Sequence, residues 1–198
     1  DSGAMEAALR DIDMSNPANI QEALSSGVLV PKDTPEQAAA LARHLMSAGR
    51  RADEEKITRY LMIAGTHASD AMSFDEAILH YDAALARTPE SKHQDRAAIL
   101  EQRGYAHRAL GDWAQSERDW REALDLMEGA EGTDRLSKMA WEVCFQLAWQ
   151  NRLSEGTELL EKNLERVGGE PSRARARLLA LLGHYRANSG FLEEGDAL

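Results

Sequence analysis

Two stretches of the chain share one pattern, AGTHASDAMSFDEAILHYDAALARTP at residues 64–89 and RGYAHRALGDWAQSERDWREALDL at residues 103–126. One constant offset superimposes them throughout. At that offset the matching positions are Gly65 with Gly104, Phe74 with Trp113, Ala77 with Ser116, Tyr81 with Trp120 and Ala84 with Ala123. Each stretch predicts two helices joined by a short turn, and the second turn falls at Gly111-Asp112.

The same pattern continues downstream in weaker form. In the third copy Cys144 takes the glycine position and Gly156 the small position, with Leu160 where the aromatic would be. In the fourth copy Gly183 takes the glycine position and Gly195 the small one. The small positions 77, 116, 156 and 195 are therefore evenly spaced to within a single residue. The last copy ends at Leu198 in its second helix and the chain starts without Met, so we expect an excised fragment.

A glycine, a small residue twelve later, an aromatic four after that and an alanine three further on are typical of the tetratricopeptide repeat. The chain resembles that family over residues 36–198. The resemblance implies an all-α fold, a right-handed superhelix of antiparallel helix pairs. We predict an N-terminal helical cap, or the end of a preceding domain, at residues 1–33. A repeat domain would follow over 34–198, with repeats near 54–90, 97–128, 134–168 and 172–198, the last one incomplete.

The period of about 40 residues exceeds the length of the standard motif, which is about 34 residues. Long repeats of this kind are similar to the sensor regions of bacterial signal-transduction ATPases, LuxR-type regulators and class III nucleotide cyclases. The segment LARHLMSAGRRADEEKITRYLMIAGTHASDAMSFDEAILHYDAAL carries this resemblance. It implies a signalling parent protein, although the fragment contains no Walker motif, cyclase signature or DNA-reading helix-turn-helix.

Local signals place several helix ends. Two sites fit a cap followed by a first-turn proline: Ser15 or Asn16 before Pro17, and Thr34 before Pro35. Gln37 would complete a capping box with Thr34. Ser73 and Glu76 form a second capping box at the start of a helix. The break Gly168-Gly169-Glu170-Pro171 separates the third copy from the fourth.

Composition narrows the possible functions. The net charge of −11 disfavours nucleic acid and anionic membranes as partners. One cysteine excludes an internal disulfide and is typical of a reducing compartment. No apolar run approaches the ~20 residues of a membrane span. These features predict a cytoplasmic protein.

The repeat pattern also predicts the core. Small residues should meet where the two helices of a pair approach most closely: Gly65 with Ala77, Gly104 with Ser116, Cys144 with Gly156, and Gly183 with Gly195. The large residues Tyr81, Trp120 and Leu160 should fill the space between successive pairs. Trp113 and Trp120 are interpreted as core residues rather than ligand-binding aromatics.

No catalytic constellation is visible. The motifs GxxxxGK[ST], HExxH, GxSxG and CxxC are absent, and no two histidines are spaced i, i+4 for a metal. Cys144 occupies a helix-crossing position and is expected to be a buried small residue rather than a nucleophile. We therefore predict a non-enzymatic protein with no cofactor and no metal.

The resemblance further implies a concave groove formed by the first helix of each pair. In this register its residues would be an aromatic and mildly basic set. The candidates are Arg59, Glu101, Tyr105, Arg108, Lys138, Trp141, Phe145, Trp149, Arg177 and His184. Such a face suits a peptide with apolar anchors and some acidic residues. Alternatively, Trp141, Phe145 and Trp149 pack between repeats. The carboxylate clamp of chaperone-tail receptors does not match, because Thr66 stands where the clamp needs asparagine.

These observations predict a scaffold that binds a protein or peptide, in keeping with the sensor part of a larger bacterial signalling protein. Two alternatives stay open. The incomplete last repeat would leave an apolar end through which copies could self-associate. A small molecule could instead occupy the concavity at Trp141, Phe145 and Trp149.

Overall fold

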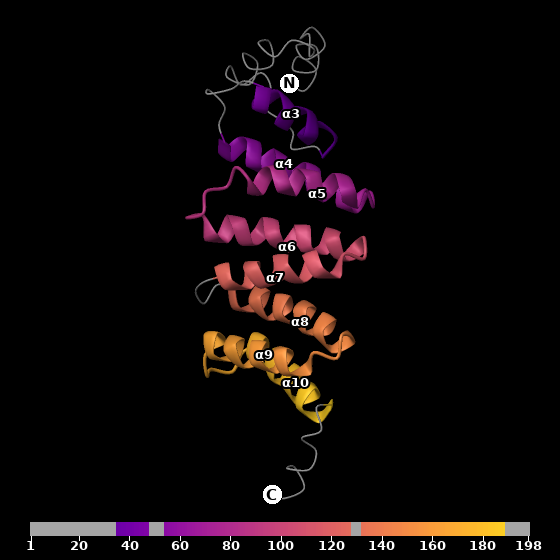
Figure 1. The fold of residues 1–198 in the computed structure, drawn as a ribbon. Coiled ribbons are helices and arrows are strands. Elements are labelled where there is room, and N and C mark those ends of the chain that lie inside the picture. Colours follow the sequence, from indigo (N-terminus) through magenta and orange to yellow (C-terminus); the bar gives the residue numbers. More distant parts are fainter. Residues whose placement is uncertain (1–34, 48–53, 128–131, 189–198) are drawn as a thin grey trace, which may run out of the picture. The chain divides into compact units, whose positions relative to one another are not determined.

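The computed structural model describes residues 35–47, 54–127 and 132–188, and all regular secondary structure in these ranges is α-helical (Figure 1). The chain divides into two compact units. The first extends to Pro89 and the second starts at Glu90. Each unit is described separately below.

The first unit contains three described helices, which are α3 (Pro35–Ser47), α4 (Glu54–Asp70) and α5 (Phe74–Leu85). Helix α4 packs against both of the others. Its buried side is formed by Ile57, Tyr60 and Leu61, whose spacing puts them on one face of the helix.

The second unit contains five described helices. They are α6 (His93–Ala109), α7 (Trp113–Leu126), α8 (Thr133–Trp149), α9 (Leu153–Val167) and α10 (Arg173–Asn188). Each helix packs against the next one in the chain, and α10 also packs against α8 (Figure 1). Short connections join α6 to α7 and α8 to α9, so each of these two pairs forms an antiparallel hairpin.

A short connection also joins α4 to α5 in the first unit, and the three hairpin turns have the same backbone structure. Met72, Gly111 and Asn151 all have positive φ, at 60°, 79° and 57°. In each turn the next residue donates its N–H to the carbonyl five residues earlier, at 2.8–2.9 Å, as in Asp112 to His107. This left-handed residue and its 6→1 bond form a Schellman motif, which ends the first helix. The turns follow one another at the same steps as the small positions 77, 116 and 156, so the predicted repeat is also a repeat of local structure.

The glycine positions of the first two hairpins are covered by aromatic rings. A Cβ on Gly104 would lie 2.5 Å from Cδ1 of Trp120, and a Cβ on Gly65 would lie 2.5 Å from the Tyr81 ring. Trp120 is fully buried, and its indole N–H donates to the Glu101 carbonyl at 3.1 Å. Each ring therefore lies against the first helix of its own hairpin, and not between hairpins as the repeat pattern predicts. The reason is geometric: an aromatic ring needs a gap in the facing helix, and the glycine supplies it.

The small position of each hairpin in the second unit meets the following helix instead. Gln146 on α8 donates its Nε2 to Ser116 Oγ at 2.8 Å. Tyr185 on α10 lies so close to Gly156 that a Cβ there would be 2.6 Å from its Cζ. The Cys144 thiol donates to the Gly156 carbonyl, with Sγ and O 3.8 Å apart, so the predicted approach of Cys144 and Gly156 is confirmed. The small residue at this position thus leaves room for a side chain from the next helix. Gly156 admits the Tyr185 ring, and Ser116 meets Gln146.

Other predictions for the core and helix ends had mixed outcomes. Leu160 and Cys144 are buried as predicted, but Trp113 is 46% exposed at the start of α7, so its assignment to the core was wrong. The Ser73–Glu76 capping box is also wrong. Ser73 makes no side-chain cap bond, and the Glu76 carboxylate lies 3.7 Å from His80 instead. The segments with Pro17, Thr34 and Gly195 lie outside the described residues.

A buried ion pair joins the helices of the α6–α7 hairpin. Asp119 is almost fully buried and accepts two hydrogen bonds from Arg103, at 2.8 Å from Nε and 2.7 Å from Nη2. His107 Nε2 lies 3.9 Å from the same carboxylate. The bidentate geometry compensates for removing the charges from water. This pair fixes one side of the helix that carries Tyr105 and Arg108.

Candidate functional site

Three large aromatic side chains form the most prominent surface feature of the second unit. Trp141, Phe145 and Trp149 follow one another at four-residue steps on one side of α8. Their exposed fractions are 43%, 46% and 79%. The rings of Phe145 and Trp149 lie edge to face, with centroids 6.1 Å apart. The three side chains, called the aromatic face below, therefore lie at the surface and not in the core.

An open cavity of about 790 Å³ lies between the aromatic face and α10. Its walls are Trp141, Phe145, Ala148, Trp149, Asn151, Leu153, Ala180, Leu181, His184, Tyr185 and Asn188. Asn188 approaches His184 twice, with Nδ2 at 3.0 Å from its Nε2 and 2.9 Å from its carbonyl. Apart from the histidine, the lining contains no ionisable group that is charged near neutral pH. We call this space the aromatic cavity.

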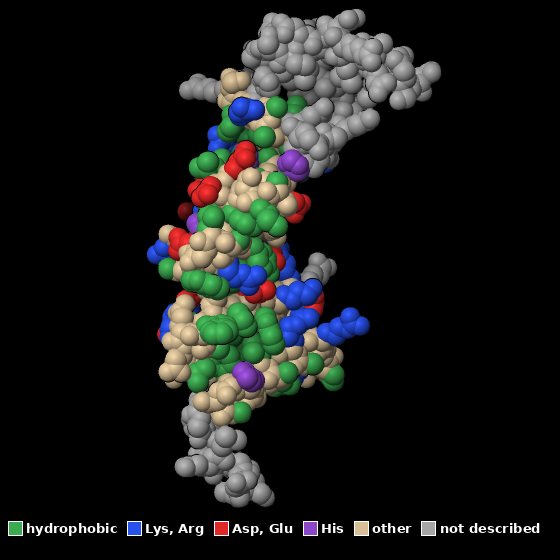
Figure 2. All heavy atoms as spheres, turned by 90° about the vertical axis from the view of Figure 1, so that its right-hand side faces the viewer, with side chains coloured by type: hydrophobic (Ala, Val, Ile, Leu, Met, Phe, Trp, Pro, Cys, Tyr) green, Lys and Arg blue, Asp and Glu red, His purple; other side chains and the backbone are tan. Residues whose placement is uncertain are grey.

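Cationic side chains lie beside the cavity, nearer the N-terminal ends of α8 and α10. Arg177 Nη1 is 3.1 Å from the Asp134 carboxylate and 2.5 Å from Ser137 Oγ. Lys138 Nζ is 2.7 Å from the same Asp134 carboxylate. Hydrogen bonds from Lys138 and Arg177 lower the pKa of Asp134. Figure 2 shows hydrophobic side chains gathered in the lower part of the view, with Lys and Arg side chains next to them.

The candidates on α6 are held by partners on α7 and α8. Arg108 pairs with Glu142, and its guanidinium lies 5.3 Å from the Tyr105 ring centroid. Tyr105 meets the Trp120 ring edge to face at 5.0 Å. Glu101 pairs with Arg135. Burial, followed by the charges of Glu142 and Glu101, raises the pKa of Tyr105. These contacts connect α6 to α8 without lining the cavity.

The structure therefore separates the candidate residues into three groups. Trp141, Phe145, Trp149 and His184 line the aromatic cavity, and Lys138 and Arg177 lie beside it on the same two helices. Glu101, Tyr105 and Arg108 belong to the ion-paired contact between α6 and α8. Arg59 is an exposed residue of α4, in the other unit.

The face carries more acidic groups than the prediction counted. The prediction counted Arg108, Lys138 and Arg177 but omitted Asp134 and Glu142, which pair with them. It also missed part of the cavity wall, namely Asn151, Leu153, Leu181 and Tyr185. Asn151 and Leu153 belong to the turn that follows the aromatic helix. They could have been found from the repeat, since a turn next to the exposed Trp149 must form the end of any cavity there.

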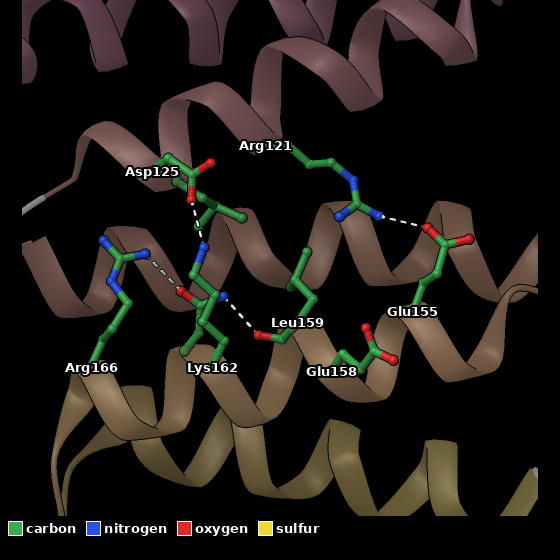
Figure 3. A pocket seen from close by; sticks show the side chains of 9 residues that line it. Arg121, Asp125, Glu155, Glu158, Leu159, Lys162 and Arg166 are labelled. Atoms are coloured by element: carbon green, nitrogen blue, oxygen red, sulfur yellow. Dashed lines mark hydrogen bonds and ion pairs between the residues drawn. The ribbon is translucent and has the colours of Figure 1, made fainter.

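A second, smaller cavity of about 240 Å³ lies between α7 and α9 in the same unit (Figure 3). Its charged side chains are largely paired with each other. Lys162 Nζ lies 2.8 Å from Asp125, and Arg121 Nη2 lies 3.3 Å from Glu155. Arg166 is held by Asn163 at 3.0 Å and by the carbonyl of Met127. We interpret these pairs as cross-helix contacts that hold α9 against α7.

Neither a metal-binding cluster nor an activated thiol is seen in the residues that the structure describes. Within these ranges no three His, Cys, Asp or Glu side chains are placed to hold a metal ion. Cys144 is buried, and burial raises the pKa of its thiol to about 12. A thiol that stays protonated at neutral pH is a poor nucleophile. Among the described helices, none has the length and apolar character required to cross a lipid bilayer.

The second unit thus contains two helical hairpins and α10, with the aromatic cavity between α8 and α10. No protein-family model matches the chain, and no curated protein matches it. Among solved structures, the chain is similar to BtubC from P. vanneervenii, with a TM-score of 0.60 and 15% sequence identity. That match covers 98% of this chain and 85% of BtubC. At this identity the similarity concerns the fold alone.

Proposed function

We propose that this protein is a non-enzymatic, tetratricopeptide-like scaffold that binds a protein or peptide in its aromatic cavity. The proposal includes a right-handed superhelix of hairpins. It also includes the sensor role in a larger bacterial signalling protein that the sequence resemblance implies. The shared backbone of the three hairpin turns, which recur at the steps of the sequence repeat, supports a repeat architecture.

The observation that carries the proposal is the exposure of the aromatic face beside a cavity of about 790 Å³. Soluble proteins leave few large aromatic side chains in contact with water unless a partner covers them. Tryptophan is enriched among the residues that dominate binding energy, because it buries a large area at low entropic cost. The amide groups of Asn151 and Asn188 at the cavity wall can bond the backbone of a bound peptide.

A peptide library offers a direct test. Random peptides would be selected on the wild-type chain, and the enriched ones measured by isothermal titration calorimetry against Phe145→Ala and Trp149→Ala. We expect each variant to weaken binding at least tenfold, because truncating a hot-spot aromatic costs about 2 kcal/mol or more. Trp113→Ala is the matched control, since Trp113 is also half exposed but does not line the cavity. Peptides that bind all four proteins equally would refute the proposed site.

A small molecule is the second candidate occupant, because the cavity volume falls within the range of ligand pockets, about 300–1,000 Å³. A metabolite that raises the melting temperature of the wild type and of Trp113→Ala, but not of Trp149→Ala, would favour this function. Self-association through the incomplete last repeat would appear instead as a mass that increases with concentration in light scattering.

A further inference from the structure

The aromatic cavity and the cations beside it occupy opposite ends of the same two helices. Lys138 lies seven residues before Phe145 on α8, and Arg177 lies seven residues before His184 on α10. At a rise of about 1.5 Å per residue this places each cation about 10 Å along its helix from Phe145 or His184, the middle lining residue of that helix, and about 4.5 Å from Trp141 or Ala180, the nearest one. The two helices pack against each other, and Arg177 reaches Asp134 on α8, so both cations lie at the same end of the site.

These cationic side chains outnumber the carboxylates with which they pair. Lys138 and Arg177 share the single carboxylate of Asp134. Arg173 is exposed one helical turn before Arg177, and Arg135, three residues before Lys138, pairs with Glu101. We call Arg135, Lys138, Arg173 and Arg177 the basic cluster. A local excess of positive charge on a chain with net charge −11 is the opposite of its average surface. Such an arrangement selects the orientation of a charged partner.

We propose that the site binds a peptide segment of defined polarity, with an apolar or aromatic side chain in the aromatic cavity and an Asp or Glu side chain at the basic cluster. This inference rests on the proposed function and specifies the partner's chemistry. An extended peptide rises by about 3.3 Å per residue, so about 10 Å corresponds to roughly three residues. The acidic residue and the apolar anchor are therefore two to four residues apart. The cavity wall discriminates against charge, since a charged side chain there would lose its hydration without a partner.

The test uses blocked synthetic peptides with one tryptophan and one glutamate, separated by two, three or four residues and in both chain directions. Each has a counterpart in which glutamine replaces glutamate. Dissociation constants are measured by calorimetry at about 0.05 M salt with the full chain. We expect at least one glutamate peptide to bind roughly fivefold more tightly than its glutamine counterpart. The difference should shrink at about 0.5 M salt because the charges are screened.

Two pairs of substitutions connect this difference to the basic cluster. Lys138→Gln with Arg177→Gln should abolish the preference for glutamate while leaving the glutamine peptides unaffected. Lys162→Gln with Arg186→Gln is the control. It also removes one Lys and one Arg from cross-helix ion pairs, with Asp125 and Glu161, but outside the site. This control should retain the preference. Thermal melts of all variants verify that they are folded.

The outcomes separate this inference from the proposed function. If glutamate and glutamine peptides bind equally and both require Trp149, the peptide-binding function stands and the polarity inference is overturned. If the preference for glutamate persists in Lys138→Gln/Arg177→Gln, the basic cluster is not its source and the inference is likewise overturned. If no peptide of the series binds while library-selected peptides still require Trp149, the stated spacing of acid and anchor is wrong.

Discussion

At the scale of single residues, the glycines of the hairpins are defined by the rings that cover them. Gly104 tolerates no Cβ, because Cδ1 of the Trp120 indole already lies 2.5 Å from the place where it would be. The ring cannot move outward easily, since its N–H is bonded to the Glu101 carbonyl and Tyr105 packs against its edge. The sequence pattern correctly predicted that this position must be small. It did not predict the ring as the cause, because the position of the ring depends on the angle between the helices.

We expect Gly104→Ala to lower the free energy of unfolding by about 1–3 kcal/mol, the usual cost of overpacking a core. Helix propensity alone would favour alanine, so a loss of stability isolates the steric effect. Urea unfolding followed by circular dichroism measures the change. Gly169→Ala is the matched control, since a Cβ there meets nothing within 4 Å, and it should alter stability by less than about 0.5 kcal/mol. Equal stability of Gly104→Ala and the wild type would contradict the observed contact.

Because Cys144 is buried, the ionisation of its thiol should make the stability of the fold depend on pH. Burial raises the pKa of its thiol to about 12, from an ordinary value of 9.0. Between these two values the folded thiol keeps a proton that the unfolded thiol releases. Its contribution to stability is therefore complete below pH 9 and is lost as the pH rises toward 12.

We expect the wild type to lose about 1 kcal/mol more than Cys144→Ala between pH 8 and pH 10. Urea midpoints at the two pH values measure this difference. The native thiol should also react with a disulfide reagent at pH 8 only as fast as the protein opens. A thiol that reacts at the rate of a free cysteine would show that Cys144 is accessible.

At the scale of elements, the three turns show how one backbone conformation accommodates three different residues. The left-handed residue is glycine in the second hairpin but Met72 in the first and Asn151 in the third. Asparagine tolerates this region, whereas methionine pays a steric cost of roughly 1–2 kcal/mol for it. The Met72 side chain is largely exposed, so it gains little from packing.

Met72→Gly should therefore stabilise the first unit by about 0.5–1 kcal/mol, after allowing for the greater freedom of glycine in the unfolded chain. Asn151→Gly should have a smaller effect. Met72→Ala keeps the Cβ and serves as the control, with no gain expected. Thermal melts of the three variants test this order, and a destabilised Met72→Gly would indicate a contact of Met72 that outweighs its backbone strain.

The aromatic elements show where reasoning from the sequence ended. The spacing of Trp141, Phe145 and Trp149 placed them together on one helix face, but it allowed either a groove or a packing role. Only the positions of neighbouring helices determine exposure, and these depend on contacts such as Tyr185 against Gly156. The ion pairs between helices could not be predicted from the sequence either. Arg108 with Glu142 and Arg135 with Glu101 connect different helix pairs, at a sequence separation that periodicity within a single helix does not reveal.

At the scale of the whole molecule, the division after Pro89 separates the candidate site from the N-terminal helices. Every residue that lines the aromatic cavity, and every member of the basic cluster, belongs to the unit that starts at Glu90. That unit has its own core, in which Trp120, Met139 and Leu160 are fully buried. In the proposed repeat architecture, stability is the sum of repeat and nearest-neighbour terms, so a shorter array can remain folded.

We therefore expect a fragment of residues 90–198 to stay helical and to bind library-selected peptides with affinities within about threefold of the full chain. Circular dichroism and calorimetry on the fragment measure both properties. Trp149→Ala in the fragment should weaken binding as much as it does in the full chain, because the site is complete within this unit. A folded fragment that binds at least tenfold more weakly would show that the N-terminal unit supplies part of the binding surface. Arg59, the one candidate on α4, would then be the first residue to substitute in the full chain.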